Sequence, residues 1–296
     1  MNQKLASYIV LIFVFFSYLQ LYPFAVSYVT RDFFRTVVDW TNGNISITVK
    51  EKLSRVVVDP NDRDYGKEYT AYNISDARSK SIIAAREKAS LRLVRAVESL
   101  RLDDQHTILS KLDLDEAFRE KFNRFYLLEP QNLNIRYKGE EVILESRIAM
   151  LGAKGIMNFL DIPFGSESFP EFDMKEYPVR YTGLIVDARH LSGAKPALLP
   201  KIVTDAGLEF FSAYYVNRSY AIDKGLVAYA KDPVLAMKDK RVGSNPFFVV
   251  ALDTVGENKT GYSISTDDVR KLLAAKQSRN SLKMCRVIIL LSQQPF

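Results

Sequence analysis

The sequence predicts an α+β fold with two small domains, each a mainly antiparallel sheet packed with helices. Three observations lead to this prediction. The chain has 296 residues, which is long enough for two domains. Its content of 47% hydrophobic and 26% charged residues is typical of a folded globular protein. Segments with alternating apolar residues stand beside segments with apolar residues spaced by three and four, so both strands and helices are expected.

Residues 1–27 have the features of a secretory signal peptide. Lys4 precedes an apolar run, and Ala25-Val26-Ser27 places small residues where a signal peptidase cleaves, so cleavage after Ser27 is predicted. The alternative is an inner-membrane anchor over residues 5–30, which carry no charge. No cysteine lies near this segment, which argues against a lipoprotein signal. In both cases the remaining chain is expected to be exported, and periplasmic or associated with the outer membrane.

Residues 28–160 are predicted to form the first domain, in which helices pack against an antiparallel sheet. Asn-Gly favours a type I′ hairpin turn, an asparagine can cap a helix, and Asp113 and Glu116 have the spacing of a capping box. The predicted elements are a hairpin over 37–49 with its turn at Asn42-Gly43, a helix from Asn73 to Leu100, a helix from Asp113 to Phe125, and strands over 133–137 and 142–150.

Basic residues are interleaved with the apolar stripe of the predicted long helix. Arg86, Arg92 and Arg95 are the candidate partner-binding residues, because a basic face can dock an acidic partner. The simpler interpretation is a solvated helix surface without a partner.

Residues 161–178 are predicted to be a linker, since three prolines exclude a regular helix or a central strand there. Residues 179–296 should form the second domain. Its predicted elements are a buried strand in the middle of the stretch 181–189, a hairpin over 201–211, a helix starting at Pro233, a strand over 247–252, a helix over 267–276 capped by Thr266, and a last strand over 287–291.

Asp187, His190 and a serine such as Ser192 raise the alternative of a periplasmic hydrolase, with His190 as base and Asp187 orienting it. The sequence argues against this alternative. Gly165-Ser166-Glu167-Ser168-Phe169 lacks the second glycine of a nucleophile elbow. A continuous strand would also place residues 187 and 190 on opposite faces. The chain is therefore predicted not to be an enzyme.

Composition and motifs argue against several other classes of site. Cys285 is the single cysteine, so the chain forms no internal disulfide and no thiolate metal cluster. Neither phosphate-binding glycine motif is present, and no cofactor, metal or small-molecule substrate is predicted. The net charge of +6 is spread along the chain, which suits a cell wall or membrane surface, and the export signal argues against nucleic acid as a partner.

The first domain resembles a known family of exported proteins. Asp39-Trp40-Thr41-Asn42-Gly43, the alanine-rich stretch over 84–89 and the stretch over 97–103 are similar to the LPP-type outer-membrane lipoprotein family. The relatives of that family include the N-terminal domain of the flagellar assembly protein T and basal-disk proteins at the outer membrane. This chain differs from the lipoprotein branch because it has no lipidated cysteine. The tract over 183–202 resembles a module of exported proteins without a known activity.

The resemblance implies a non-enzymatic, scaffolding module. The function expected from the sequence is therefore a structural or assembly role in the envelope, with a flagellar or secretion apparatus as one setting. The expected partners are envelope proteins or a second copy of the chain. They are predicted to dock on open sheet edges, because small sheets have too few strands to close into a barrel.

Overall fold

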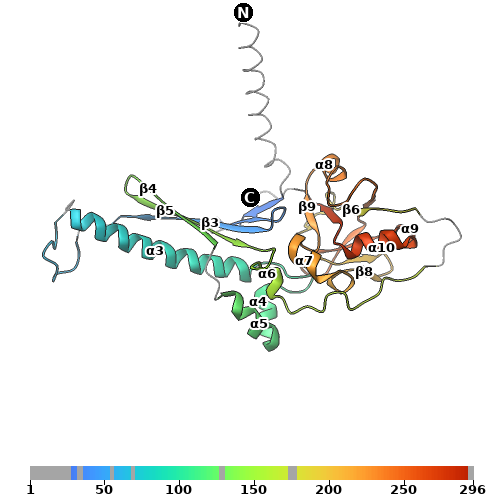
Figure 1. Ribbon diagram of the computed structural model, residues 1–296, viewed down its shortest axis with the longest axis horizontal. Coiled ribbons are helices and arrows are strands. Elements are labelled where there is room, and N and C mark those ends of the chain that lie inside the picture. Colours follow the sequence, from blue (N-terminus) through green and yellow to red (C-terminus); the bar gives the residue numbers. More distant parts are fainter. Residues whose placement is uncertain are drawn as a thin grey trace, which may run out of the picture.

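The computed structural model describes residues 28–31, 36–53, 57–67, 71–126, 131–172 and 179–292. Over these ranges the chain is an α+β protein with two domains side by side, which confirms the predicted class (Figure 1). The predicted signal peptide lies outside the described residues. Within the described ranges, no helix is both long enough and apolar enough to cross a membrane.

An antiparallel sheet with strand order β1-β2-β3-β5-β4 forms the first domain. Its two longest strands, β3 and β5, alternate between buried and accessible residues, so only one face of the sheet is apolar. Ile45, Ile47 and Val49 of β3 are all buried on that face. The strands are β1 (Val29–Arg31), β2 (Val37–Asp39), β3 (Asn44–Lys52), β4 (Gln131–Lys138) and β5 (Glu141–Ala149).

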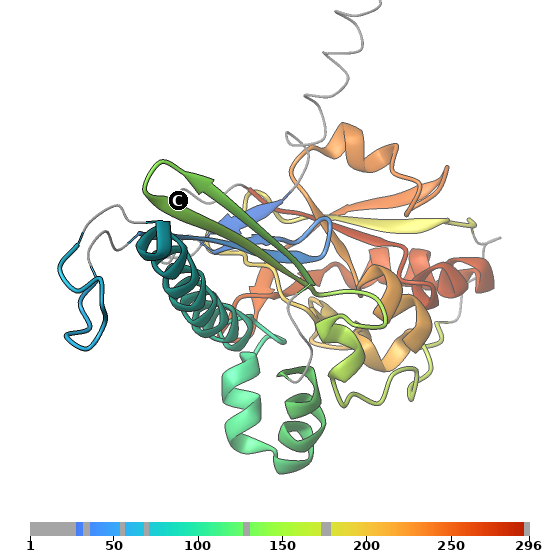
Figure 2. The same ribbon diagram turned by 60° about the vertical axis from the view of Figure 1, so that its left-hand side comes forward.

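Helix α3 (Ala71–Glu98) covers this apolar face (Figure 2). Ala85, Ala89 and Leu93 are buried at a spacing of four, as predicted, and the two alanines allow the helix to lie close to the strands. The helix begins before Asn73, so the prediction of Asn73 as its cap is wrong. Alanine has the highest helix propensity, and Ala71 extends the helix past the predicted start.

The predicted hairpin at Asn42-Gly43 is confirmed as β2 and β3, but its turn is not of type I′. Four residues, Trp40–Gly43, separate the paired Asp39 and Asn44. Gly43 has a φ of 64°, whereas Asn42 does not have the positive φ that a type I′ turn needs. The Asp39 carboxylate instead accepts hydrogen bonds from the backbone N–H groups of Thr41 and Asn42, at 3.1 and 2.9 Å. This Asx-type contact favours the wider turn.

Three short helices complete the first domain. Thr107 and Ser110 form the capping box of α4 (Ile108–Leu114), and Asp115 accepts a hydrogen bond from the Phe118 N–H in the first turn of α5 (Glu116–Tyr126). The predicted capping box of Asp113 and Glu116 is therefore wrong, because Asp113 lies inside α4. The buried side of α5 is as predicted, with Phe118, Phe122 and Phe125 in the core. The third helix is α6 (Ile156–Phe159).

The second domain contains two four-stranded sheets. Every pairing in β10-β6-β13-β9 is parallel, and β11-β12-β7-β8 is parallel between β12 and β7 only. Strands β6 and β13 are buried at every residue, as is typical of parallel strands covered on both faces. This domain therefore has more parallel pairing than the mainly antiparallel sheet that was predicted. Uniformly buried strands show no alternation of apolar and polar residues, so their sequence does not indicate how they pair.

The predicted strands and helices of this domain are otherwise found. Asp232 caps α8 with Pro233 at its first position, as predicted, whereas Ser265 and not Thr266 caps α9. The elements are β6 (Gly183–Asp187), β7 (Ile202–Thr204), β8 (Glu209–Phe211), η1 (Ala213–Tyr215), α7 (Arg218–Lys224), β9 (Ala228–Ala230), α8 (Pro233–Met237), β10 (Pro246–Val250), β11 (Asp253–Val255), β12 (Gly261–Ile264), α9 (Thr266–Ala274), α10 (Lys276–Lys283) and β13 (Val287–Leu290).

One hydrophobic core continues across both domains. The Trp40 ring packs edge-on against Tyr229 of β9, with 5.8 Å between centroids, and the Thr41 hydroxyl donates to the Tyr229 carbonyl at 2.9 Å. The backbone N–H groups of Leu198 and Leu199 donate to carbonyls of the loop after α3, at 3.0 and 2.7 Å. We call this contact region the domain joint. Because it is apolar and hydrogen-bonded, the two domains are held together as a unit.

The predicted linker is not a free connection over its described part, residues 161–172. Phe169 stacks on Tyr215 at 5.4 Å, and Gly165 donates to the Ala213 carbonyl at 3.2 Å, so this stretch lies against the second domain. Residues 173–178 lie outside the described residues. At the other end, β1 pairs with β2, so residues 29–30 belong to the sheet and cannot be part of the alternative anchor over 5–30.

Candidate functional site

Asp187 and Arg189 form an ion pair at the carboxyl end of the parallel strand β6. The Arg189 guanidinium donates two hydrogen bonds to the Asp187 carboxylate, at 2.8 and 2.6 Å, and the Arg189 backbone N–H donates a third at 3.1 Å. These bonds to Arg189 hold the pKa of Asp187 below its usual value. The carboxylate is therefore already occupied by a cation.

The hydrolase alternative needs Asp187 to orient His190, and the structure does not provide that contact. Among the described residues, no hydrogen bond joins His190 to Asp187 or to a serine, and His190 and Ser192 are both exposed. The other histidine, His106, lies in the first domain, with its Nδ1 atom 3.2 Å from the Asp103 carboxylate. Asp187 and His190 are electrostatic neighbours, but the described residues contain no hydrogen-bonded Asp–His–Ser arrangement around them.

The three candidate arginines of α3 do not form one surface. An α-helix turns about 100° per residue, so Arg86 and Arg95, nine positions apart, lie on opposite sides of the helix. Arg92 lies closer to the side of Arg95 and is half-buried, whereas Arg86 and Arg95 are exposed. Neighbouring cations are already engaged: Lys88 pairs with Glu51, and the Arg78 guanidinium lies 4.9 Å from the Tyr137 ring centre. A partner could contact only some of these arginines at once.

Strand β4 is an end strand of the first-domain sheet, and its outer side pairs with no other described strand. Gly139, with a φ of 58°, is the first residue of a two-residue turn between Lys138 and Glu141, as in a type II′ hairpin. A hydrogen-bonded pair flanks such a turn, and hydrogen-bonded pairs then alternate along the ladder. On this register the N–H groups of Ile135 and Tyr137 point outward from the sheet.

The face of this sheet opposite α3 is polar and covered by none of the described helices (Figure 1). It forms a shallow depression of about 380 Å³ with polar side chains on three neighbouring strands. Arg136 and Glu145 form an ion pair at its edge. The polar residues that line the depression include Ser46, Thr48, Asn134, Glu145 and Arg147. An open, polar face beside a free edge can bind a protein partner, but it lacks the enclosure of a small-molecule site.

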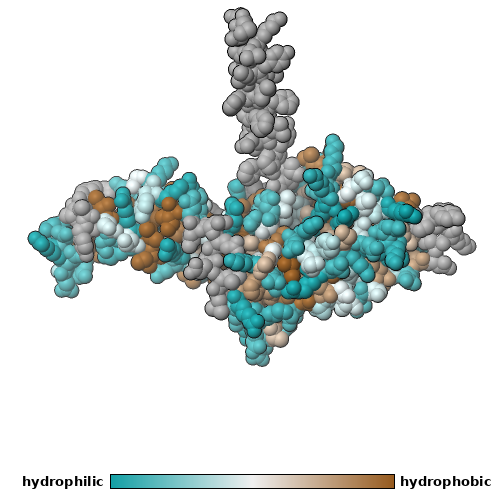
Figure 3. Space-filling model, viewed as in Figure 1, coloured by the Kyte–Doolittle hydropathy of each residue, from teal (hydrophilic) through white to brown (hydrophobic). Residues whose placement is uncertain are grey.

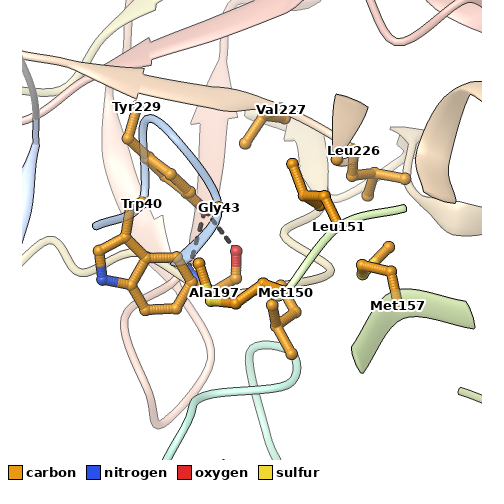
Figure 4. Close-up of a pocket in the computed structure, with 11 residues that line it drawn as sticks. Trp40, Gly43, Met150, Leu151, Met157, Ala197, Leu226, Val227 and Tyr229 are labelled. Carbon is orange, nitrogen blue, oxygen red and sulfur yellow. Dashed lines mark hydrogen bonds between the residues drawn. The ribbon is translucent and has the colours of Figure 1, made fainter. Parts of the chain in front are cut away.

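The domain joint contains a small apolar cavity of about 20 Å³ (Figure 4). Trp40 and Leu151 line it from the first domain, and Leu226 and Tyr229 line it from the second. A space of this size holds about one water molecule, and its apolar walls offer little to bind one. The cavity is therefore a packing gap within the joint.

The described residues contain no group of three or more His, Cys, Asp and Glu side chains that could hold a metal ion. Cys285 is fully buried, and burial raises the pKa of its thiol to about 12. A thiol with so high a pKa is a poor nucleophile.

No sequence pattern marks the outward-facing groups of β4, or the three cations near the domain joint, Arg101, Lys195 and Lys259. The alternation in the strand over 133–137 predicts the strand itself but does not show that it ends a sheet. The three cations are far apart in the chain, and no motif connects them.

Comparison with known proteins gives one result for the second domain. No curated protein matches the chain. Residues 183–293 match the family model of the second domain of Treponema pallidum Tp0624. The matched stretch begins at the first residue of β6 and ends shortly after β13. Over its second domain, this chain is thus similar to the second domain of that Treponema protein.

Proposed function

We propose that this protein is a non-catalytic, exported component of the bacterial envelope that acts in assembly, with a flagellar or secretion apparatus as one setting. The observation that carries this proposal is the free edge of β4. The first domain offers its partners a preformed strand edge, and the second domain is joined rigidly to it.

Hairpin β4–β5 and helix α3 together form an arm that extends away from the second domain (Figure 1). The arm is stiff, because α3 packs along β3 and β5. Outward-pointing N–H groups along such an edge can pair with a strand of another chain, which is a common way to assemble β modules. The docking chain can be an envelope protein or a second copy of this chain.

The arm also carries exposed apolar side chains. Ile83 and Leu91 on α3 are 57% and 62% exposed, and Tyr137 on β4 is 45% exposed. Figure 3 shows hydrophobic surface on the arm over α3 and the neighbouring strands. Exposed apolar side chains are typical of protein-binding surfaces, because docking removes them from water.

The start of the described chain bears on the export signal. Tyr28 is fully buried, and its backbone N–H donates to the Thr41 hydroxyl at 2.8 Å. Tyr28, the first residue after the proposed cleavage site, is thus fixed to the turn of the first hairpin. The mass of the exported protein distinguishes the proposed cleavage after Ser27 from retention of the segment as an anchor.

A proline at Tyr137 tests the edge-docking proposal. Tyr137→Pro removes an outward N–H group without removing a hydrogen bond of the β4–β5 ladder, so the domain should still fold. We expect this variant to recover at least tenfold less of the partner proteins, or of a second copy, from crosslinked envelopes. The matched control Tyr137→Ala removes the same side chain but keeps the N–H group.

Tyr137→Ala should retain most of the association. Equal association by both variants and the unchanged protein would contradict docking at the β4 edge. Equal loss in both variants would assign the effect to the tyrosine ring and not to the strand edge. Circular dichroism of each variant verifies that the fold is intact.

A further inference from the structure

Three cations from separate parts of the chain meet at the domain joint. Arg101 lies in the loop after α3, Lys195 in the loop before β7, and Lys259 in the turn between β11 and β12. Backbone hydrogen bonds fix the three segments to one another: the Leu198 N–H donates to the Arg101 carbonyl at 3.0 Å, and the Lys195 N–H donates to the Lys259 carbonyl at 3.0 Å.

The positive charge of this cluster is not balanced. Repulsion by Arg101, followed by burial and by repulsion from Lys259, lowers the pKa of Lys195. Burial lowers the pKa of Arg101, and only the hydroxyls of Tyr28 and Tyr262 oppose this effect. Within the described part of the chain, none of the three cations forms an ion pair. The buried carboxylate of Asp104, in the same joint, is already paired with Lys201 at 2.8 Å.

A buried hydroxyl group without a partner lies beside these charges. Tyr28 is 0% exposed and is an electrostatic neighbour of Arg101, and its hydroxyl has no hydrogen-bond partner among the described residues. A buried polar atom without a hydrogen-bond partner is destabilising, so such atoms are rare unless a ligand or a water molecule supplies the missing partner. Tyr262 differs, since its hydroxyl donates to the Lys195 carbonyl at 2.8 Å.

The backbone at Lys259 is held in an uncommon conformation. Lys259 has a φ of 54°, in the left-handed region that non-glycine residues rarely adopt. A Cβ at Gly193 would lie 3.2 Å from Lys259 Cδ and 3.3 Å from its Nζ, so the absence of a side chain there leaves room for the lysine. Strained backbone of this kind persists where the surrounding structure imposes it, and it is concentrated at functional sites.

We propose that Arg101, Lys195 and Lys259, together with the Tyr28 hydroxyl, form a binding site for a phosphoryl group. A phosphate monoester carries close to two negative charges near neutral pH and offers three strong acceptor oxygens. It therefore balances three cations better than a single carboxylate does. The guanidinium can donate two parallel hydrogen bonds to it, and the lysines and the hydroxyl can supply further donors.

Thermal unfolding of the full chain tests this site, with inorganic phosphate as the probe. The single tryptophan, Trp40, lies in the joint, so its fluorescence reports the relevant region. Sodium phosphate is compared with sodium chloride of the same ionic strength. We expect a rise in Tm of about 5–10 °C at a phosphate concentration near 100 times the Kd. No rise beyond that of the chloride control, together with no response to the two organic phosphates described below, would overturn the proposal.

Substitutions of single cations test whether the phosphate response comes from the domain joint. Arg101→Gln and Lys195→Met should lose the phosphate response, whereas Arg86→Gln, which removes one exposed positive charge from α3, should keep it. Without phosphate, Arg101→Gln should be at least as stable as the unchanged protein, because it removes an unbalanced charge. A phosphate response retained in both joint variants, or an Arg101→Gln variant that is less stable without phosphate, would overturn the assignment.

Two further probes distinguish the source of the phosphoryl group. A response to glycerol 3-phosphate indicates a free phosphate ester, and a response only to vesicles that contain phosphatidic acid indicates a lipid headgroup. Either response supports the site, and failure of all three probes excludes it. This inference rests on the joint and not on the β4 edge, so its failure would leave the proposed assembly function untouched.

Discussion

Arg241 and Arg101 are both withdrawn from water, but their surroundings are opposite. The Arg241 guanidinium donates to three backbone carbonyls, those of Cys285, Lys224 and Gly225, at 2.8, 2.7 and 2.6 Å. Its pKa is lowered by burial to about 10, so it remains charged at neutral pH. The Arg101 guanidinium has no hydrogen-bond or ion-pair partner among the described residues, and the neighbouring cation Lys195 repels it.

The carbonyls that hold Arg241 lie near the ends of α7 and α10, where helix carbonyls lack partners within the helix. Arg241 thus satisfies groups that would otherwise be left without donors. Burial alone therefore does not define the role of an arginine. An arginine whose N–H groups all donate to its own chain has a structural role. An arginine whose N–H groups have no acceptor and lie near another cation is suited to binding an anion.

The largest expected loss of stability follows substitution of Arg241. Arg241→Met keeps the apolar stem but leaves three carbonyls without their donor, so the free energy of unfolding should fall by about 3–5 kcal/mol. Arg241→Lys keeps the charge and can reach fewer of the carbonyls, so its loss should be intermediate. Chemical denaturation measures both. A loss below about 1 kcal/mol in Arg241→Met would mean that the two arginines do not differ as described.

The second-largest expected loss of stability follows substitution of Gly256, which lies against Asp104 in the loop after α3. Gly256 has a φ of 80°, and a Cβ there would lie 2.3 Å from the Asp104 carbonyl oxygen across the joint. Gly256→Ala should therefore lower the free energy of unfolding by about 2–4 kcal/mol and alter Trp40 fluorescence. Gly207→Ala is the matched control, because Gly207 has a φ of 83° but open space around it. The control should lose only about 1 kcal/mol, and equal losses would show that the contact with Asp104 is unimportant.

The smallest effect is at a third arginine, Arg189, which has a carboxylate partner. The Arg189 side chain is 39% exposed, so solvent screens the pair and Arg189→Gln should cost only about 0.5 kcal/mol at pH 7. The folded-state pKa of Asp187 is lowered, so the contribution of the pair is present above the unfolded pKa of about 3.9. It is lost as the pH falls through the folded pKa. The variant and the unchanged protein should then converge once the Asp187 carboxyl is protonated in the folded state, and a difference that persists there would contradict an electrostatic origin.

Local patterns in the sequence were sufficient for most elements of the fold. The stripe of Ala85, Ala89 and Leu93 predicts α3, and the alternation over 142–150 predicts β5. Aspartate followed by proline predicts the start of α8 at Pro233. Each of these depends on residues close in the chain. The caps at Asn73 and Thr266 were wrong because several neighbouring polar residues can cap a helix, and only the folded backbone selects one.

The candidate sites could be predicted less well. Arg86, Arg92 and Arg95 are visible in the sequence as a basic group, but the turn of the helix separates them. Asp187 and His190 are close in the chain, yet Arg189, between them, takes the carboxylate. Residues close in the sequence were thus expected to act together but do not. Side-chain direction depends on backbone geometry, which a linear pattern does not contain.

Periodicity and composition are local properties, so the sequence alone is sufficient for the α+β class, for the order of most helices and strands, and for the exclusion of an internal disulfide. Tertiary structure decided the parallel pairing of β6, β10 and β13, the position of β4 at an open edge, and the meeting of Arg101, Lys195 and Lys259 at the joint. These features arise from contacts between segments far apart in the chain. Uniformly buried strands and scattered cations carry no local signal of which neighbours they will meet.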